Sequence, residues 1–388
     1  MSTLKVNKIE NTATSNGGVE IDNTGHVQID GVQMPTAGPL SNRNLVINGA
    51  MQVAQRGTSS TTNGYETVDR FRTSWSGGTI TQSQEVLSSG SPYDEGFRYF
   101  ARLTNTDVTT DVNHWRRWIH YIEAQNIAQS GWDYTNTNSH ITLSYWVRSS
   151  VSQEFFHYVD TRDGSQRKLF YWSTGTLAAN TWTKITKTIP GHADLAFDNN
   201  NDIGLQIDLG AYLGQDTTSS SAGSADTWND RVSSNRTPDY TQTWANTDEA
   251  TFDITGVQLE VGEKATPFEH RIYGDELARC QRYYVQDGGS NFHQLFGAIG
   301  FATTTTSCAL KAFLPVPMRN SATLSFTGTP RLDNGQAGFN CSALTGSHPN
   351  TDLNYYSMTA TSSSLTTHQP LIIDAGSTAA LVKIDAEL

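Results

Sequence analysis

Aromatic side chains set among polar ones are the residues of this sequence with the most informative chemistry. Four of them, Trp115, Trp118, Trp132 and Tyr134, lie in segments that also carry Arg, Asn and Asp. Aromatic faces stack on the C–H side of a sugar ring, while amides and carboxylates hydrogen-bond its hydroxyls. We therefore treat these four as candidate carbohydrate-binding residues, although most Trp residues of a β-protein belong to its core.

A second candidate binding segment is the pair Tyr355 and Tyr356, which follows the polar run 348–354. Tyrosine at a polar loop tip is favoured at recognition surfaces. The alternative is that one of the pair packs inward, because successive side chains of a strand point to opposite faces.

One acidic turn could hold a cation. Asp198, Asn200 and Asp202 offer oxygen ligands at alternate positions, as a calcium loop does. Ile203 stands where an EF-hand loop needs Gly, and an Asn/Asp-rich turn before a strand explains the pattern equally well. We expect no metal site, with calcium as the alternative.

Motifs of catalysis are missing from the sequence: it contains no G-x-S-x-G, G-x-G-x-x-G, P-loop or H-E-x-x-H. A glycosidase pair is defined by the separation of two carboxylates in space, so 38 acidic residues leave it open. Cys280, Cys308 and Cys341 form no C-x-x-C and are expected to be reduced thiols. We predict a protein without enzymatic activity or a cofactor.

The net charge and composition of the sequence disfavour some classes of binding partner. The formal net charge is −12, which disfavours nucleic acid and anionic membranes as partners. No apolar run approaches the roughly 18–20 residues of a membrane span, so we expect no membrane insertion. The N-terminal residues also have no apolar segment of the signal-peptide type.

Strict alternation of apolar and polar residues predicts antiparallel strands over 141–147 and 203–209. The alternation in 252–261 changes parity at Gly256, which predicts a β-bulge. We assign residues 41–274, which hold all nine Trp, to a jelly-roll β-sandwich. The Ser/Thr/Gly-rich segment 215–227 is expected to be an exposed loop at its edge.

Residues 1–40 contain a short repeat, in which Val19 and Ile21 are followed eight residues later by Val27 and Ile29. The turn at 23–25 predicts a hairpin, and two strands this short cannot bury a core alone. We predict that these four residues drive oligomerisation of an N-terminal stalk, the alternative being a simple terminal hairpin.

The C-terminal part begins with a predicted connector helix over 275–284, capped by Asp275. Residues 285–388 contain no Trp, which supports a domain boundary. Strand patterns at 308–314, 324–326, 371–373 and 381–384 predict a smaller β-sandwich domain. The chain is thus predicted to be all-β.

Several segments resemble parts of bacteriophage tail-fibre proteins. Residues 44–57 and 65–71 are similar to the start of a jelly-roll module of such fibres, and 254–270 to its last strand and exit. Residues 277–284 resemble the connector that follows, and 1–9 the N-termini of fibre-like proteins of marine and cyanobacterial phages. These motifs are structural: the resemblance implies that Asp69 and Arg70 anchor a turn, and that Gly262 and Pro267 shape the exit loop.

The resemblance implies a homotrimeric tail fibre in the virion, assembled in the host cytoplasm. Its N-terminus would attach to tail adaptor or nozzle proteins, and its β-domains would bind host-surface polysaccharide. Two alternatives remain. One is a fibre or knob that decorates the capsid, and the other is a polysaccharide depolymerase spike, which usually shows long stacked repeats that this sequence lacks.

Overall fold

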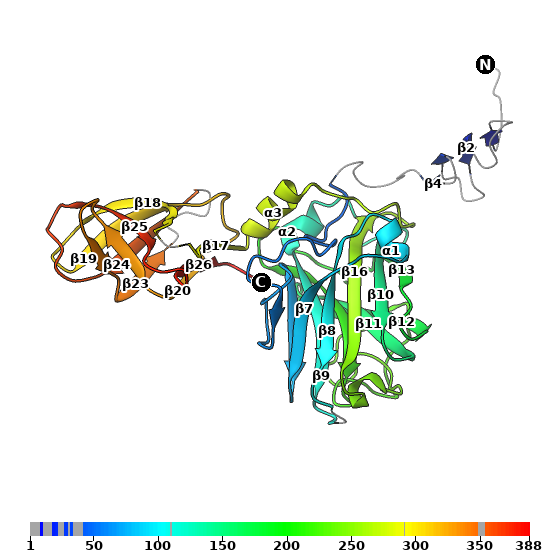
Figure 1. The fold of residues 1–388 in the computed structure, drawn as a ribbon. Coiled ribbons are helices and arrows are strands. Elements are labelled where there is room, and N and C mark those ends of the chain that lie inside the picture. Colours follow the sequence, from blue (N-terminus) through cyan, green and yellow to red (C-terminus); the bar gives the residue numbers. More distant parts are fainter. Residues whose placement is uncertain are drawn as a thin grey trace, which may run out of the picture. The chain divides into compact units, whose positions relative to one another are not determined.

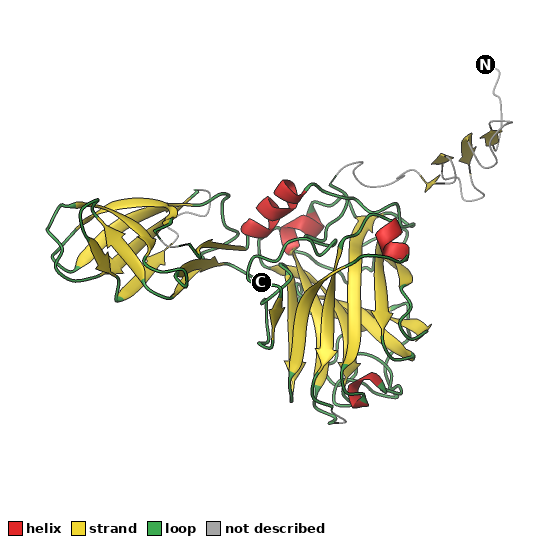
Figure 2. Cartoon of the chain, in the orientation of Figure 1, coloured by secondary structure: helices red, strands yellow, loops and turns green. Residues whose placement is uncertain are grey.

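The computed structural model describes residues 8–10, 18–21, 27–29, 32–33, 42–108, 111–290, 292–347 and 354–388. Strands dominate these residues, which confirms the all-β prediction (Figure 2). The chain divides into two compact units, Met1–His270 and Arg271–Leu388. Within the described ranges, no helix has the length and apolarity to cross a membrane.

The first unit contains a β-sandwich of two six-stranded sheets with antiparallel pairing (Figure 1). The sheet that we call the β10 sheet has the order β13-β10-β16-β8-β7-β5, and the β14 sheet has the order β15-β12-β11-β14-β9-β6. The β10 sheet consists of β5 (Ser59–Ser60), β7 (Ile80–Val86), β8 (Tyr99–Asn105), β10 (His140–Ser149), β13 (Thr183–Pro190) and β16 (Ala250–Val261). The β14 sheet consists of β6 (Phe71–Ser76), β9 (Trp115–Glu123), β11 (Gln153–Thr161), β12 (Lys168–Leu177), β14 (Ile203–Leu213) and β15 (Trp228–Asp230). Short helices α1 (Ser91–Asp94), α2 (Ala124–Ala128) and η1 (Trp244–Asn246) lie in the connections.

The core lies between these two sheets because their strands alternate apolar and polar side chains. Leu143 and Val147 of β10 and Ile207 and Leu209 of β14 are buried in one shared cluster. The strands predicted at 141–147, 203–209 and 252–261 therefore face the core as expected. Side chains on the other face of the β14 sheet are left to contact loops or ligands.

The predicted β-bulge at Gly256 is present. On β10 one residue separates Ser144 from Trp146, whereas two residues separate their partners Gln258 and Thr255 on β16. Gly256 has φ +64, and a Cβ there would meet the Phe97 ring at 2.7 Å. Both the backbone conformation and the close approach of the ring require glycine.

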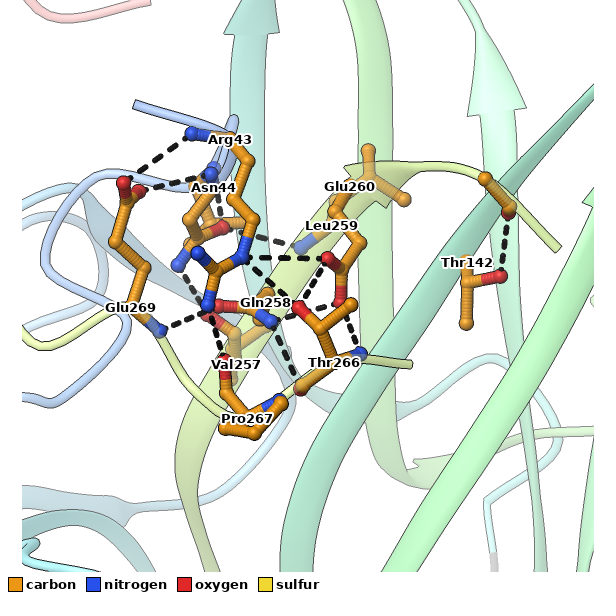
Figure 3. Close-up of polar contacts among 12 residues, drawn as sticks. Arg43, Asn44, Thr142, Val257, Gln258, Leu259, Glu260, Thr266, Pro267 and Glu269 are labelled. Atoms are coloured by element: carbon orange, nitrogen blue, oxygen red, sulfur yellow. Dashed lines mark hydrogen bonds and ion pairs between the residues drawn. The ribbon is translucent and has the colours of Figure 1, made fainter. Parts of the chain in front are cut away.

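A polar clasp closes the sandwich where its chain enters and leaves (Figure 3). Arg43 donates from Nη2 to the Pro267 carbonyl at 2.5 Å, and the Asn44 N–H donates to Glu269 at 3.0 Å. The Asn44 side-chain oxygen accepts from the Leu259 N–H at 3.1 Å. The segments that resemble the two ends of a fibre module are thus joined to each other, and the Pro267 carbonyl is one of the acceptors.

The turn expected at Asp69 and Arg70 is also anchored. Asp69 Oδ1 accepts from the Gln55 N–H at 2.9 Å. Arg70 is fully buried, has φ 69, and donates from Nη2 to the Tyr121 carbonyl at 2.9 Å. Its guanidinium therefore fixes this turn to β9.

The N-terminal strands form a small antiparallel sheet with one apolar face. It has the order β1 (Lys8–Glu10), β2 (Gly18–Ile21), β3 (Val27–Ile29) and β4 (Val32–Gln33). The register pairs Ile9 with Val19, Val19 with Ile29, and Ile21 with Val27. Paired residues point to the same side of a sheet, so these apolar side chains share a face. The hairpin pairing of the repeat is as predicted, while the turn at 23–25 lies outside the described residues.

The second unit starts with α3 (Tyr273–Gln281), which differs in its bounds from the helix predicted over 275–284. Its N-cap position is Ile272, and Asp275 lies inside the first turn, where a carboxylate interacts favourably with the helix dipole. Two sheets follow, in the orders β17-β26-β20 and β22-β21-β25-β18-β19-β24-β23. Their strands are β17 (Tyr284–Gly288), β18 (Gln294–Ala302), β19 (Ser307–Phe313), β20 (Thr323–Thr327), β21 (Pro330–Asp333), β22 (Gly338–Asn340), β23 (Ala343–Ser347), β24 (Tyr355–Thr361), β25 (Pro370–Ala375) and β26 (Leu381–Asp385). Both sheets contribute to one separate core.

Candidate functional site

The outer face of the β14 sheet carries a row of polar and aromatic side chains. Register places Tyr158 of β11 opposite Asp208 of β14, and Asp160 opposite Gln206. Arg117 of β9 donates from one Nη1 to Asp208 at 2.8 Å and to the Tyr158 hydroxyl at 2.8 Å. Burial opposes the charge of Arg117, but the neighbouring carboxylate of Asp208 raises its pKa.

Further arginines surround Asp160, which follows Tyr158 by two residues in β11. Arg167 forms a bidentate pair with Asp160, and Arg231 Nε lies 3.5 Å from its Oδ2. Burial raises the pKa of Asp160, opposed by the positive charges of Arg167, Arg231 and Arg162. Arg162 itself donates to the Gln206 amide oxygen at 3.2 Å. We call these arginines, with Arg117 and Arg236, the arginine face.

The segment 214–246 packs over part of this sheet. Arg236 is fixed by its backbone N–H, which donates to the Thr217 carbonyl at 2.9 Å. Its Nη1 lies 3.3 Å from the Tyr158 hydroxyl. The Tyr240 ring packs against Phe156 at 5.1 Å between centroids. Residues 223–227 of the predicted loop 215–227 are exposed as expected. Thr217 and Thr218 are buried, so the prediction is wrong at these two positions, where the Thr217 hydroxyl donates to the Gly214 carbonyl.

A cavity of about 210 Å³ opens beside this segment. Its lining combines two tyrosine rings with amides, a hydroxyl and a carboxylate: Tyr212, Gln215, Thr218, Asp239, Tyr240, Gln242 and Asn246. This volume is below the roughly 300–1,000 Å³ of a site for a drug-sized ligand, so it suits a single ring or a chain end. Rings to stack on a sugar and amides to bind its hydroxyls are the groups that carbohydrate recognition needs.

The four aromatic candidates of the sequence are distributed over different parts of the sandwich. Trp115 lies on the arginine face, where its Nε1 donates to Ser74 at 3.0 Å and Arg117 stacks on its ring. Trp118 is 0% exposed and belongs to the core, where no ligand reaches it. Trp132 is also buried in that core, and Tyr134 packs against its edge. The structure therefore leaves Trp115 on a surface beside the candidate site.

The two candidate tyrosines of the second unit point to opposite sides of β24. Tyr356 is 0% exposed and donates to the Ala322 carbonyl at 2.9 Å, so it is a core residue, as strand alternation demands. Tyr355 is half-buried, with the Lys311 ammonium 4.8 Å from its ring centroid. Of the pair, Tyr355 is the one accessible to a ligand.

The acidic turn is a hydrogen-bonded chain reversal. The Asn200 side chain accepts from the Asp202 N–H at 3.0 Å, and the Asp198 N–H donates to Asp163 at 3.1 Å. The backbone carbonyls of Asn200 and Asp202 accept from the start of α2. In the described ranges no group of three or more His, Cys, Asp or Glu could hold a metal ion.

Sequence reasoning missed the cavity and the arginine face. Tyr212 lies near the end of β14, whereas Asp239 and Tyr240 lie in an irregular segment more than 25 residues further along the chain. The arginines come from three separate stretches, with no motif in common. The preponderance of arginine over lysine, 18 against 8, is the one signal in this acidic sequence that could have prompted a search for an arginine-lined surface.

A second hollow, of about 560 Å³, lies on the seven-stranded sheet of the second unit. Its lining is mainly apolar, with Ile299, Phe301, Leu371 and Ile372 beside the turn 333–335. It offers fewer groups for sugar hydroxyls than the cavity beside Tyr240, which we therefore take as the candidate site.

No protein-family model matches the chain. No curated protein matches its sequence either. Solved structures give similarities of low identity. The enzymatically active domain of tailspike protein 4 of bacteriophage CBA120 is 10% identical with a TM-score of 0.29, over 56% of this chain and 21% of that one. This chain thus spans about a fifth of that tailspike domain.

Two carbohydrate-binding modules are also similar. The family 11 module of a cellulosomal cellulase of Clostridium thermocellum is 12% identical with a TM-score of 0.27, over 53% of this chain and 96% of that one. A xylan-binding domain of Paenibacillus barcinonensis is 9% identical with a TM-score of 0.28, over 60% of this chain and 100% of that one.

Proposed function

We propose that this protein is a carbohydrate-binding component of a phage virion, most simply a tail fibre, and that it binds host-surface polysaccharide without cleaving it. The observation that carries the binding role is the cavity beside Tyr240. It combines two tyrosine rings with three amides, and it lies at the surface of the sandwich. Binding sites are more precise when regular elements hold their parts, and here Gln242 clamps both the N–H and the carbonyl of Leu213.

The absence of cleavage is proposed from the same lining. Glycoside hydrolysis needs a pair of carboxyl groups about 5–10 Å apart on either side of the scissile bond. Among the described residues that line the cavity, one carboxylate, Asp239, is present, and it accepts a hydrogen bond from Thr218 at 2.6 Å. A single anchored carboxylate suits hydrogen bonding to sugar hydroxyls.

The virion role is proposed from the resemblance of residues 44–57 and 254–270 to a tail-fibre module. The clasp supports it, because those segments meet in the folded unit as the two ends of one module. We propose that the chain forms a homotrimer through the apolar face of β1–β4, attaches there to tail adaptor or nozzle proteins, and projects its β-domains outward. Antibody labelling of virions is expected to mark the tail, and labelling of the capsid would replace the tail fibre by a capsid-decorating fibre or knob.

The binding role is tested by filling the cavity. Asn246 is exposed at its rim, so Asn246→Trp would occupy it without disturbing the core. On an array of bacterial surface polysaccharides, the wild-type chain is expected to bind at least one polymer, and Asn246→Trp to weaken that binding about tenfold or more. The matched control is Asn138→Trp, which changes an exposed Asn far from Asn246 in the sequence and should bind like the wild type.

Two results would contradict this proposal. Equal binding by Asn246→Trp and the wild type would remove the cavity as the site. Shortening of the bound polymer on incubation with the protein, measured by size-exclusion chromatography, would replace a binding protein by a depolymerase.

A further inference from the structure

Two arginines of the arginine face donate their hydrogen bonds to neutral groups. Arg162 donates to the Gln206 amide, and Arg236 lies against the Tyr158 hydroxyl. Within the part of the chain that the structure describes, neither forms an ion pair, whereas Arg117, Arg167 and Arg231 each contact a carboxylate. The face therefore carries positive charge that its own carboxylates do not neutralise.

Arg236 lacks a carboxylate partner, whereas Arg117 and Arg231, whose Nε atoms also make no hydrogen bond among the described residues, each face a carboxylate. The Arg236 Nε is buried and lacks a hydrogen-bond partner among the described residues. Leaving a buried donor of a charged group unpaired costs free energy. An oxyanion that accepts from the Nη groups of this guanidinium would supply the negative charge that it lacks, because arginine presents donors in a fork that matches a carboxylate or sulfate group.

Crowding of like charges points in the same direction. Asp160 is shared between Arg167 and Arg231, so one carboxylate serves two guanidinium groups. The pKa of Arg231 is lowered by burial and by the positive charges of its neighbours Arg236 and Arg167. A negative group bound among them would reduce this repulsion.

The arginine face adjoins the cavity. Arg236 precedes the cavity residues Asp239 and Tyr240 by three and four positions in the same segment. The Tyr158 ring, whose hydroxyl it contacts, belongs to the buried hydrophobic cluster against which Tyr240 packs. The cavity and Arg236 are thus linked through one segment of the chain and one cluster of side chains.

We propose that this site selects an acidic polysaccharide, with Arg236 binding a carboxylate or sulfate group of the sugar unit next to the one in the cavity. The inference rests on the proposed carbohydrate-binding function and specifies the charge of its ligand. Arg231 and Arg162 flank the bound anion, while Arg117 is held by Asp208 and positions Tyr158. An acidic polysaccharide thus binds to this protein of net charge −12 through the arginine face.

The test compares polymers that differ in charge and share a backbone. Polygalacturonate and its fully methyl-esterified form are the carboxylate pair, and dextran sulfate and dextran are the sulfate pair. Binding of the full chain is measured by biolayer interferometry at 0.15 M salt, where unspecific attraction is screened beyond about 8 Å. We expect the charged member of at least one pair to bind about tenfold more tightly than its neutral counterpart, and the pair that does so identifies the group.

Three variants locate the effect. Arg236→Gln keeps a donor for Tyr158 but removes the charge, and is expected to abolish most of the preference for the charged polymer. Arg236→Lys should restore part of it. Arg98→Gln removes an equal charge from an exposed position before β8, outside the arginine face, and should leave the preference intact.

The outcomes separate this inference from the proposed function. Equal affinity for the charged and neutral members of both pairs overturns the inference, as does an equal loss in Arg236→Gln and Arg98→Gln. If Asn246→Trp still abolishes binding of a neutral polymer in that case, the carbohydrate-binding function stands without charge selection. If Asn246→Trp binds every polymer like the wild type, the proposed site itself fails.

Discussion

Arg117 of β9 and Asp208 of β14 form an ion pair of 2.8 Å between neighbouring strands, and the Asp208 side chain is 0% exposed. The same Asp208 oxygen also accepts from the Gln206 amide at 2.9 Å. The pair therefore stabilises the sheet face on which the arginines and the Tyr158 hydroxyl are displayed. Removing one partner would leave a charge buried without compensation, which is far more costly than losing a surface ion pair.

We expect Asp208→Ala to destabilise the first unit by about 3–5 kcal/mol, because the guanidinium of Arg117 would stay buried without its carboxylate. Thermal unfolding followed by circular dichroism measures this loss. Lys184→Ala, which removes an exposed ion pair with Glu95, is the control and should cost less than about 1 kcal/mol. Equal losses in the two variants would show that Asp208 is not held as described.

Acid should destabilise the first unit through its buried histidines. His157 is fully buried with its Nδ1 2.6 Å from the Tyr145 hydroxyl, and burial lowers its pKa to about 3. Burial and the charge of Arg70 lower the pKa of His120 as well. The unfolded chain binds protons at these groups near pH 6.5, whereas the folded chain binds them only at much lower pH. Stability is therefore full above pH 6.5 and falls as the pH drops from about 6.5 toward 3.

The size of this effect is about 1.4 kcal/mol per pH unit for each histidine in that window. Unfolding by urea at pH 7, 6, 5 and 4 measures the slope. His157→Gln keeps a polar partner for Tyr145 and cannot be protonated, so its stability should fall less steeply with acid than that of the wild type. Parallel slopes would mean that His157 is not protonated on unfolding.

Local patterns predicted the sandwich but not its site, for a physical reason. Alternation fixes which face of a strand is buried, so β10, β14 and β16 and the bulge at Gly256 could be read from neighbouring residues. Composition likewise separated the Trp-rich first unit from the second. These features are set by residues that lie close together in the sequence.

The candidate site depends instead on long-range pairing. Arg117, Asp208 and Tyr158 meet because β9, β14 and β11 are neighbours in one sheet, and nothing in any single strand encodes that order. The same limit applies to Trp118: its polar surroundings in the sequence suggested a ligand contact, but alternation in β9 turns its side chain into the core. Trp115, an odd number of residues away, lies on the other face.

The tyrosine pair in β24 separates a stability effect from a binding effect. Tyr356→Ala is expected to cost about 3–5 kcal/mol in the second unit, because it empties a core position and leaves the Ala322 carbonyl without its donor. Trp75→Ala should likewise act as a folding defect in the first unit, where that ring packs against the core. Tyr355→Ala, at the half-buried position, should cost less than about 1.5 kcal/mol.

Adhesion to host cells then tests the role of Tyr355. A fall in adhesion of Tyr355→Ala at unchanged melting temperature would place a second contact on the second unit. Thr359→Ala, at an exposed position of the same strand and the same face, is its control. Unchanged adhesion in Tyr355→Ala would limit host binding to the first unit.

The N-terminal sheet leads to a prediction about assembly. Its apolar face leaves Ile9 64%, Val19 39%, Ile21 45% and Ile29 42% exposed, although these side chains lie side by side in register. Lys8 and Glu20 form an ion pair across β1 and β2, with Gln28 next to Glu20 in the register. A four-stranded sheet of such short strands gains stability when another sheet covers its apolar side, and further copies of the same chain offer matching faces.

Deleting residues 1–40 is therefore expected to leave both β-domains folded while abolishing the oligomer. Light scattering on a sizing column should give three times 42.6 kDa for the full chain. The single substitution Val19→Glu, at the centre of the apolar face, should also yield monomers, whereas Gln28→Glu, which adds the same charge on the polar face, should not. A monomeric full chain, or an unchanged oligomer in Val19→Glu, would remove the apolar face of β1–β4 as the oligomerisation surface.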